Sequence, residues 1–291
     1  MATKLSEAKM FGGTWLRLKH DSKTVGTPME FSVYLPPKAV GGEKVKCVYY
    51  LSGLTCTDKN VMEKSGIQRA ASVYNVAIVA PDTSPRNPPE AKIPGEDDSW
   101  DFGSGAGFYV DATQEPWNKQ YKMYSYVTKE LPELLATEMP MILTGSENTG
   151  IMGHSMGGHG AITIALKNPD KYKSLSAFAP ICNPINCPWG KKNLGNYLGE
   201  DTSTWTPYDS TELAKAYAGP KFHLLVSQGT KDTFLERELM PEALKAAVES
   251  NNNLTIDLHM DEGYDHSYCY IATEIEAHIK HHAAILGDPG R

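Results

Sequence analysis

The segment from residue 148 to 161 carries the residue best suited to covalent chemistry. It reads Asn-Thr-Gly-Ile-Met-Gly-His-Ser-Met-Gly-Gly-His-Gly-Ala, so Gly153 to Gly157 match the pattern G-x-S-x-G around Ser155. We expect a short strand before the pattern and a helix after it, the context in which a sharp turn exposes a nucleophilic serine. The glycines let strand and helix approach, and the helix N-terminus favours negative charge beside the serine. A surface serine in a glycine-rich turn is the alternative interpretation.

A serine nucleophile needs a base, and in α/β-hydrolases the acid and then the histidine follow the serine along the chain. Six histidines lie well downstream of Ser155: His223, His259, His266, His278, His281 and His282. His266 is preferred because it stands in the turn Gly263-Tyr-Asp-His-Ser-Tyr268, between the last expected strand and the last expected helix. The first two fall inside expected strands, and the last three lie on a helical face, where we expect solvated side chains. A histidine at a helix start is the non-catalytic alternative for His266.

Asp232 is the preferred acid. It follows the apolar strand 222–227 in the loop Gln228-Gly-Thr-Lys-Asp-Thr-Phe-Leu235, at a strand's C-terminal end, where α/β sheets bind ligands. Its rivals are Asp257, Asp261 and Asp265, and an N-cap of the next helix is its structural alternative. The spacing leaves room for two further strand-helix units before Asp232 and one after it, which fits the expected topology.

Acyl transfer also needs two N–H donors that face the developing oxyanion. The amide of Met156, directly after the serine, is one candidate. The second is expected in Tyr49-Tyr-Leu-Ser-Gly-Leu-Thr-Cys-Thr57, where an apolar strand precedes a glycine, and we favour the amide of Leu54. Cys56 is either a small buried side chain or a thiol that lines the pocket, and the sequence leaves both open.

The elements that must position these residues form an α/β pattern. Strands are expected at 14–19, 29–35, 46–51, 76–80, 149–152, 175–178, 222–227 and 254–260, and helices at 121–137, 156–168, 235–250 and 267–285. This order predicts a mostly parallel central sheet with antiparallel N-terminal strands and helices on both faces. No repeat or linker divides the chain, so we expect one domain over residues 1–291.

A long segment, 81–117, interrupts this pattern with six prolines, four glycines and five aromatic residues. Long loops in compact domains are usually functional or disordered. Five aromatic side chains argue against disorder because they need packing partners. The sequence therefore predicts that this loop forms a wall over the active site.

Composition excludes several classes of function. The 291 residues include 28 basic and 35 acidic ones, for a net charge of −7, with no basic tract and no apolar run long enough to span a membrane, so nucleic acid and membranes are not expected partners. Five cysteines without a C-x-x-C spacing argue against a disulfide framework and a zinc site. The N-terminus lacks the apolar segment of a signal peptide, so a cytoplasmic location is expected.

Taken together, the motifs resemble the S-formylglutathione hydrolase family, also called the esterase D family. The matching segments are Leu51 to Thr57, Ser99 to Ala112, Pro116-Trp117, Tyr121 to Leu135, Gly153 to Gly160 and Asp265 to Tyr268. The resemblance implies an α/β-hydrolase fold, with Ser155, Asp232 and His266 as the catalytic triad. It places the oxyanion donors on Leu54 and Met156. One departure is Cys269, where an aromatic residue is expected.

The same resemblance implies hydrolysis of the thioester S-formylglutathione to glutathione and formate, side activity on short-chain esters, no cofactor and a homodimer. A formyl group is small, so we expect a small pocket with residues 100–117 as its wall, and with Trp100 and Cys56 among its lining. Glutathione carries two carboxylates, which a chain of net charge −7 repels at long range. We therefore expect a local cation near the mouth, Lys59 or Arg86. A short-chain carboxylesterase acting mainly on oxygen esters, an acyltransferase and a non-catalytic binding module are the alternatives.

Overall fold

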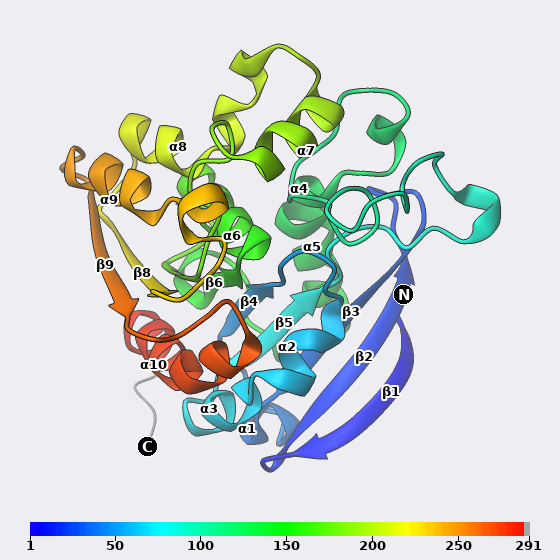
Figure 1. The fold of residues 1–291 in the computed structure, drawn as a ribbon. Helices are drawn as coiled ribbons and strands as arrows, with labels where there is room; N and C mark the ends of the chain where they lie inside the picture. Colours follow the sequence, from blue (N-terminus) through cyan, green and yellow to red (C-terminus); the bar gives the residue numbers. More distant parts are fainter. Residues whose placement is uncertain (288–291) are drawn as a thin grey trace.

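A nine-stranded sheet runs through the computed structural model, which describes residues 1–287 (Figure 1). The strand order is β1-β2-β3-β5-β4-β6-β7-β8-β9, from β1 on the right of Figure 1 to β9 on the left. The strands are β1 Thr3–Met10, β2 Gly13–Asp21, β3 Pro28–Leu35, β4 Cys47–Leu51, β5 Ala77–Pro81, β6 Thr149–His154, β7 Ser174–Phe178, β8 Phe222–Gly229 and β9 Leu254–Asp261. Strands β1, β2 and β3 pair antiparallel, as do β3 and β5, and every later pair is parallel.

Helices cover both faces of this sheet, which confirms the predicted fold class. They are α1 Pro37–Val40, α2 Asp58–Lys64, α3 Ile67–Val73, α4 Met123–Ser125, α5 Leu131–Glu138, α6 Met156–Lys167, α7 Pro188–Leu198, α8 Ser210–Ala216, α9 Pro241–Glu249 and α10 Tyr268–Leu286. Short 3₁₀ turns are η1 Pro89–Ala91, η2 Trp117–Lys119, η4 Ser146–Asn148, η5 Thr202–Thr204 and η6 Thr206–Tyr208, and π-helical turns are η3 Tyr126–Glu130 and η7 Leu235–Leu239. The predicted domain extends to Arg291, and residues 288–291 lie outside the described residues.

The central strands are apolar on both sides because both sides are covered. Every residue of β4, β5, β6 and β7 is buried, as expected for parallel strands between two helical layers. Neighbouring residues of β4 point to opposite faces: Tyr49 packs into the core under α5, α6, α8 and α9, whereas Tyr50 packs into the core under α2, α3 and α10. The carboxyl ends of β4, β6, β8 and β9 lead into the loops that carry the candidate catalytic residues.

Over the described residues, the structure differs from the expected elements in one divided helix, one unpredicted strand and five unpredicted helices, α1, α2, α3, α7 and α8. The helix expected over 235–250 is divided into η7 and α9 at Met240, whose φ of 52° lies in the left-handed region. Pro241 follows it, and a proline cannot continue the hydrogen bonding of a preceding helix. Strand β1 was not predicted because Thr3 to Lys9 are all exposed. The strand therefore has no buried face that would give an alternating apolar pattern in the sequence. None of the helices described in residues 1–287 is long and apolar enough to cross a membrane.

The prediction that the histidines of α10 are solvated was wrong. His278 and His282 are 1% and 0% exposed. Ser176 Oγ on β7 lies 2.9 Å from His278 Nδ1 and 2.9 Å from His282 Nε2. Ser227 Oγ and Ser174 Oγ satisfy the remaining ring nitrogens at 2.9 and 2.7 Å. The two imidazoles are buried because α10 packs on β7 and β8, where serines supply a partner for each nitrogen.

These buried rings should make stability fall in mild acid. Burial lowers the pKa of six histidines, to about 4 for His159 and His281 and in the same direction for His20, His154, His278 and His282. Below about pH 6.5 the unfolded chain binds protons that the folded protein does not, so the free energy of unfolding falls as the pH is lowered, by up to about 1.4 kcal/mol per pH unit for each histidine. Above about pH 6.5 this pH dependence disappears, because the histidines are neutral in both the folded and the unfolded state.

Urea unfolding at pH 7.5 and 5.5 measures this loss. The variant His282→Gln removes one of the six groups, so it should lose about 1 kcal/mol less than the wild type between the two pH values. An equal loss in both proteins would show that His282 does not carry its share of the dependence.

Candidate active site

Ser155 is the single residue between β6 and α6, and its backbone conformation is rare for a residue other than glycine. Its φ and ψ are 59° and −119°, a strained region that such turns use to lift a side chain off the main chain. The Ser155 amide donates to the Phe178 carbonyl at 2.9 Å. A Cβ at Gly153 would lie 2.1 Å from the Gly157 carbonyl oxygen, and one at Gly157 would lie 1.9 Å from that of Leu51. Both flanking positions therefore require glycine.

Gly157→Ala should unfold this turn. The new methyl group would meet the carbonyl oxygens of Leu51 and Ser52 at 1.9 and 2.6 Å, and these main-chain atoms belong to the end of a buried strand. We expect a loss of about 3 kcal/mol in the free energy of unfolding, measured by urea denaturation. Gly41→Ala is the control, because Gly41 has a φ of −74° and its nearest foreign atom would be 3.3 Å away. A loss of similar size in both variants would contradict the steric explanation.

His266 is paired with the buried carboxylate of Asp232. His266 lies in the loop between β9 and α10, and its Nδ1 is 2.5 Å from Asp232 Oδ2. The Asp232 side chain is 0% exposed, and it also accepts from Gln228 Nε2 at 3.1 Å and from the Phe234 amide at 2.9 Å. A carboxylate on Nδ1 fixes the imidazole tautomer and leaves Nε2 free to exchange a proton.

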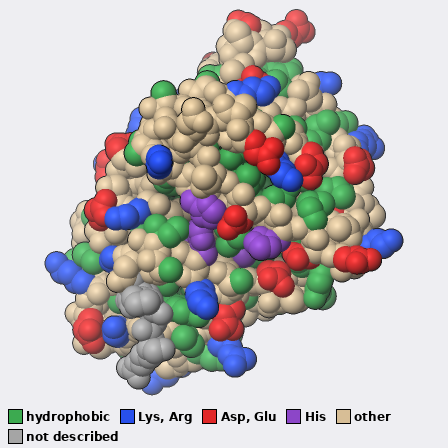
Figure 2. All heavy atoms as spheres, turned by 90° about the vertical axis from the view of Figure 1, so that its left-hand side faces the viewer, with side chains coloured by type: hydrophobic (Ala, Val, Ile, Leu, Met, Phe, Trp, Pro, Cys, Tyr) green, Lys and Arg blue, Asp and Glu red, His purple; other side chains and the backbone are tan. Residues whose placement is uncertain are grey.

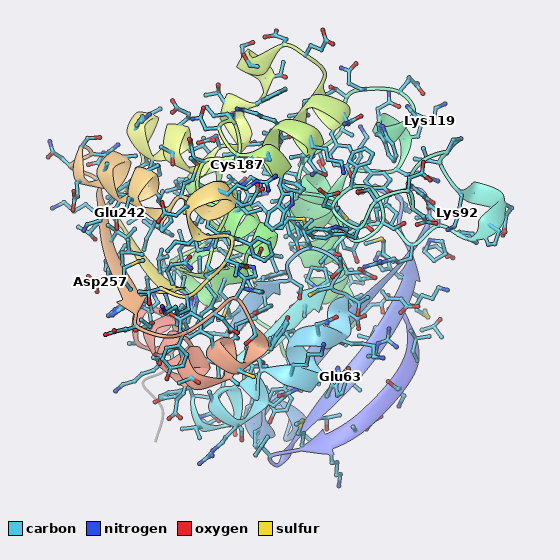
Figure 3. The ribbon with its side chains drawn as sticks, in the orientation of Figure 1. Glu63, Lys92, Lys119, Cys187, Glu242 and Asp257 are labelled. Carbon is cyan, nitrogen blue, oxygen red and sulfur yellow. The ribbon has the colours of Figure 1, made fainter. Side chains whose placement is uncertain are left out.

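The three rival aspartates have other partners. Asp257 lies at the outer edge of the molecule (Figure 3), with its Oδ2 3.5 Å from His223 Nε2. On the face that carries β9, histidine and acidic side chains lie side by side (Figure 2). Asp261 accepts the Tyr270 hydroxyl, and the exposed Asp265 accepts the amide and hydroxyl of Ser267. Of the four candidates in the sequence, Asp232 alone contacts His266.

Ser155 and His266 line one small cavity of about 140 Å³. Its lining comprises Gly53, Leu54, Cys56, Trp100, His154, Ser155, Trp189, Phe234 and His266. Aromatic rings fix the imidazole from two sides, with the ring centres of Phe234 and His154 at 5.1 and 4.5 Å. Ser155 Oγ and His266 make no direct hydrogen bond in the described part of the chain. In hydrolases this bond commonly tightens only in the substrate complex.

Two unpaired amides adjoin the serine. Within residues 1–287, neither the Leu54 nor the Met156 amide donates a hydrogen bond to another group. Met156 is the first residue of α6, where helix amides lack internal partners and the helix dipole favours an anion. Leu54 follows Gly53, whose Cβ would lie 3.0 Å from Ser155 Cβ, so this loop packs directly on the serine. The two amides can stabilise negative charge that forms beside Ser155.

The four residues expected in the substrate pocket separate into two groups. Cys56 and Trp100 line the cavity, and Cys56 is partly buried. Lys59 and Arg86 do not line it. Lys59 Nζ lies 3.4 Å from the carboxylate of Glu63, which points outward from α2 (Figure 3), whereas Arg86 is paired with Asp82.

Sequence reasoning missed three lining residues: His154, Trp189 and Phe234. Two of them had a local signal, since His154 is the residue before the nucleophile and Phe234 stands two positions after the acid. Trp189 had none, because α7 reaches the site only through the tertiary fold.

Of the five aromatic residues in the long loop 81–117, only Trp100 lines the cavity. Trp100 is 57% exposed, and its ring packs edge-on against Trp189 at 5.6 Å. Phe102 and Trp117 instead pack with Tyr121 and Tyr197 in the interior. The prediction that residues 100–117 as a whole wall the pocket was therefore wrong: buried aromatic residues in a loop more often anchor it to the core than face a ligand.

The cysteines of the chain are free thiols. Cys47, Cys182 and Cys187 are buried free thiols, whereas Cys269 is exposed at the start of α10. Among the residues that the structure describes, no cluster of three or more histidine, cysteine, aspartate or glutamate side chains could hold a metal ion.

The sheet topology and the turn that carries Ser155 define an α/β-hydrolase, and residues 22–281 match the family Esterase, described as "Putative esterase". The chain is 51% identical to the S-formylglutathione hydrolase of Rattus norvegicus, over 97% of this chain and 98% of the rat protein. It is 52% identical to that of Arabidopsis thaliana, over 98% and 99%. The chain therefore belongs to the S-formylglutathione hydrolase family. A solved S-formylglutathione hydrolase from Agrobacterium tumefaciens, 45% identical, superposes with a TM-score of 0.92 over 98% of this chain and 99% of that one.

Proposed function

We propose that this protein hydrolyses S-formylglutathione to glutathione and formate, with Ser155 as nucleophile, His266 as base and Asp232 as the acid that orients it. The observation that carries the proposal is the 2.5 Å contact between the buried Asp232 and His266, since His266 lines the same small cavity as Ser155. The relatives named for this activity match over nearly the whole chain, which supports the choice of substrate.

The mechanism follows from this geometry. His266 Nε2 takes the proton of Ser155 while Oγ attacks the formyl carbon, and the Leu54 and Met156 amides receive the oxyanion. The tetrahedral intermediate collapses, the C–S bond breaks, and glutathione leaves either as a thiol that takes the proton from His266 or as a thiolate, in which case His266 gives its proton to solvent. Water then attacks the formyl-serine, with His266 again as base, and formate leaves as Ser155 is reprotonated. Because a thiolate departs with little protonation, the oxyanion donors should contribute more than general-acid help.

The size of the cavity supports a small acyl group. A volume of about 140 Å³ bounded by Trp100, Trp189 and Phe234 is below the usual range for drug-sized ligands. Trp100, exposed at the rim, offers a face for the thiol component. The expected cations contribute less than assumed, since the Arg86 charge is balanced by Asp82 and Lys59 pairs with Glu63.

A competition between substrate classes tests the proposal. The value of kcat/KM should be at least about 100-fold higher for S-formylglutathione than for S-acetylglutathione or 4-nitrophenyl acetate. A higher value for the oxygen ester would replace the proposal with a general carboxylesterase. Product formation on an added alcohol, at the expense of hydrolysis, would replace it with an acyltransferase.

Three further expectations belong to this proposal: a single domain over residues 1–291, a cytoplasmic location and a homodimer. Five unpaired cysteines support a reducing compartment. Light scattering coupled to gel filtration gives the assembly state directly.

A further inference from the structure

We propose that Arg86 and Asp82 form a clamp that holds the oxyanion donor Leu54 in place, so that Arg86 is a positioning residue for catalysis. The inference rests on the proposed function, because it assumes that the Leu54 amide receives the oxyanion. It concerns two residues outside the cavity, neither of which contacts the reacting atoms.

The loop that carries Leu54 is strained. Thr55, its next residue, has a φ of 67°, a left-handed conformation that a β-branched side chain adopts at a cost of about 1 to 3 kcal/mol. Outside the loop, the Thr55 amide donates to the Gly105 carbonyl at 2.9 Å. Such a conformation persists only where surrounding contacts hold it in place. The contacts of the neighbouring Cys56 supply this support.

The carbonyl oxygen of Cys56 is the point of attachment. It accepts from Arg86 Nη2 at 2.8 Å and from Thr83 Oγ1 at 2.5 Å. Both donors come from the segment after β5, so they tie the end of the β4 loop to the neighbouring strand of the sheet. This carbonyl lies two residues after Leu54, within the same tight turn, in which the Cys56 amide donates to the Gly53 carbonyl at 3.2 Å.

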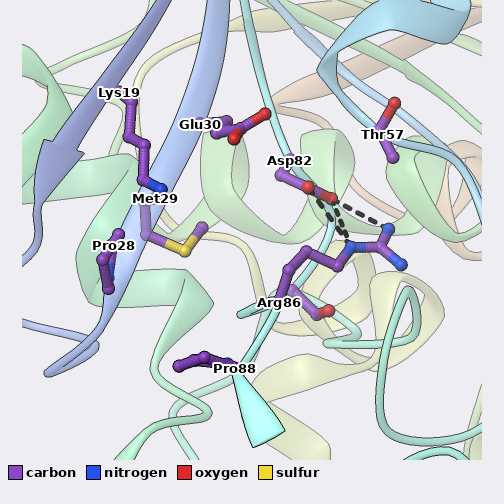
Figure 4. A pocket seen from close by; sticks show the side chains of 9 residues that line it. Lys19, Pro28, Met29, Glu30, Thr57, Asp82, Arg86 and Pro88 are labelled. Atoms are coloured by element: carbon purple, nitrogen blue, oxygen red, sulfur yellow. Dashed lines mark hydrogen bonds and ion pairs between the residues drawn. The ribbon is translucent and has the colours of Figure 1, made fainter. Parts of the chain in front are cut away.

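Asp82 fixes the guanidinium in turn. Arg86 Nη2 lies 2.9 Å from Asp82 Oδ1, and Nε lies 3.2 Å from both carboxylate oxygens. Figure 4 shows this pair at the wall of a separate cavity of about 300 Å³, whose lining also includes Lys19, Glu30 and Thr57. Asp82 is 4% exposed; burial raises its pKa, and Arg86 opposes this rise more strongly than the hydrogen bond from the Thr83 amide does. The fork geometry of arginine reaches the carboxylate and the carbonyl together, which lysine cannot do.

A clamp of this kind acts on the transition state. The hydrogen bond from the Leu54 amide is stronger to the oxyanion of the transition state than to the carbonyl oxygen of the bound thioester. Displacing the amide therefore lowers kcat and leaves KM nearly unchanged. Removal of a whole oxyanion donor costs about 10²- to 10³-fold in kcat. A displaced donor retains part of its effect, so we expect about a 10- to 100-fold loss.

The test compares Arg86→Ala, Arg86→Lys and Thr83→Val with Arg69→Met. Arg69 is the matched control because it is exposed on α3 and makes no side-chain hydrogen bond or ion pair in residues 1–287. Besides kcat and KM, the affinity of a short-chain trifluoromethyl ketone, which forms a tetrahedral adduct with a serine, is measured beside that of the corresponding alcohol. In both Arg86 variants the affinity for the ketone should fall by about the same factor as kcat. Their affinity for the alcohol should equal that of the wild type. Thr83→Val should also lower kcat and the affinity for the ketone, whereas Arg69→Met should change neither.

Rescue separates positioning from general damage. The cavity beside Arg86 admits a guanidinium ion, so millimolar guanidinium chloride should raise kcat of Arg86→Ala and leave Arg86→Lys and the wild type unchanged. An unchanged kcat and ketone affinity in Arg86→Lys would overturn the clamp, as would a loss confined to KM. Arg86→Lys keeps a charge beside Asp82, so it decides the question even if Arg86→Ala fails to fold. Ketone affinity does not depend on which ester is the natural substrate, so a wrong substrate leaves this test intact.

Discussion

Replacing Ser155 by alanine should abolish turnover of the proposed thioester substrate and of short-chain esters, with kcat lowered by about 10⁵- to 10⁶-fold. No other group on the cavity combines a nucleophilic oxygen with a place beside His266. The folded state should persist, because the Ser155 hydroxyl makes no hydrogen bond in the described residues, while its main-chain amide remains bound to Phe178. Steady-state kinetics and a urea unfolding curve measure the two effects.

Ser203→Ala is the matched control, since Ser203 is exposed on the short turn η5. A serine-directed phosphonate should label the wild type and Ser203→Ala, and mass spectrometry should locate the label on Ser155. Esterase turnover retained in Ser155→Ala, or a label on another residue, would contradict the assignment of the nucleophile.

Asp232→Asn should lower kcat by about 10⁴-fold while KM changes little. The carboxamide has nearly the same shape, but its NH₂ group opposes an N–H on His266 Nδ1, so the ring adopts the tautomer that cannot accept the Ser155 proton through Nε2. The amide of Phe234 can still donate to the remaining carbonyl oxygen, which preserves the loop. The loss should appear in the pre-steady-state acylation rate, measured with a chromogenic ester.

Asp265→Asn is the control for this prediction. Asp265 precedes His266 directly, yet it is exposed, and within residues 1–287 its carboxylate accepts side-chain and main-chain hydrogen bonds from Ser267 alone. Its variant should keep kcat within about threefold of the wild type, in line with the small effects of surface substitutions. A larger loss in Asp265→Asn than in Asp232→Asn would reverse the assignment of the acid.

The sequence located the candidate site well because its residues follow strand ends. A motif of five residues marked Ser155, and the order of elements brought His266 and Asp232 to the same edge of the sheet. The choice among four aspartates was less secure. Only the fold shows that Asp257 and Asp261 have partners of their own, since those partners are set by strand register and helix packing.

The sequence could not reveal contacts whose partners lie far along the chain. His278 and His282 look like solvated residues of a polar helix face until β7 and β8 place serines against them. Arg86 looks like a free cation in a proline-rich loop until Asp82 and the Cys56 carbonyl are seen beside it. In each case the chemistry of one residue was visible, and the partner that determines its role was supplied by tertiary structure.

The cavity beside Ser155 has two unlike walls, and this asymmetry decides how the enzyme can be engineered. Gly53 lies on one wall, and Gly153 and Gly157 flank Ser155 in the turn behind it, where an added Cβ would meet neighbouring atoms at 3.0 Å or less. Trp100, Trp189 and Phe234 form the other, where side chains alone occupy the space. A directed-evolution library for bulkier acyl groups should therefore randomise Trp100, Trp189 and Phe234. Variants at the glycines would mostly fail to fold.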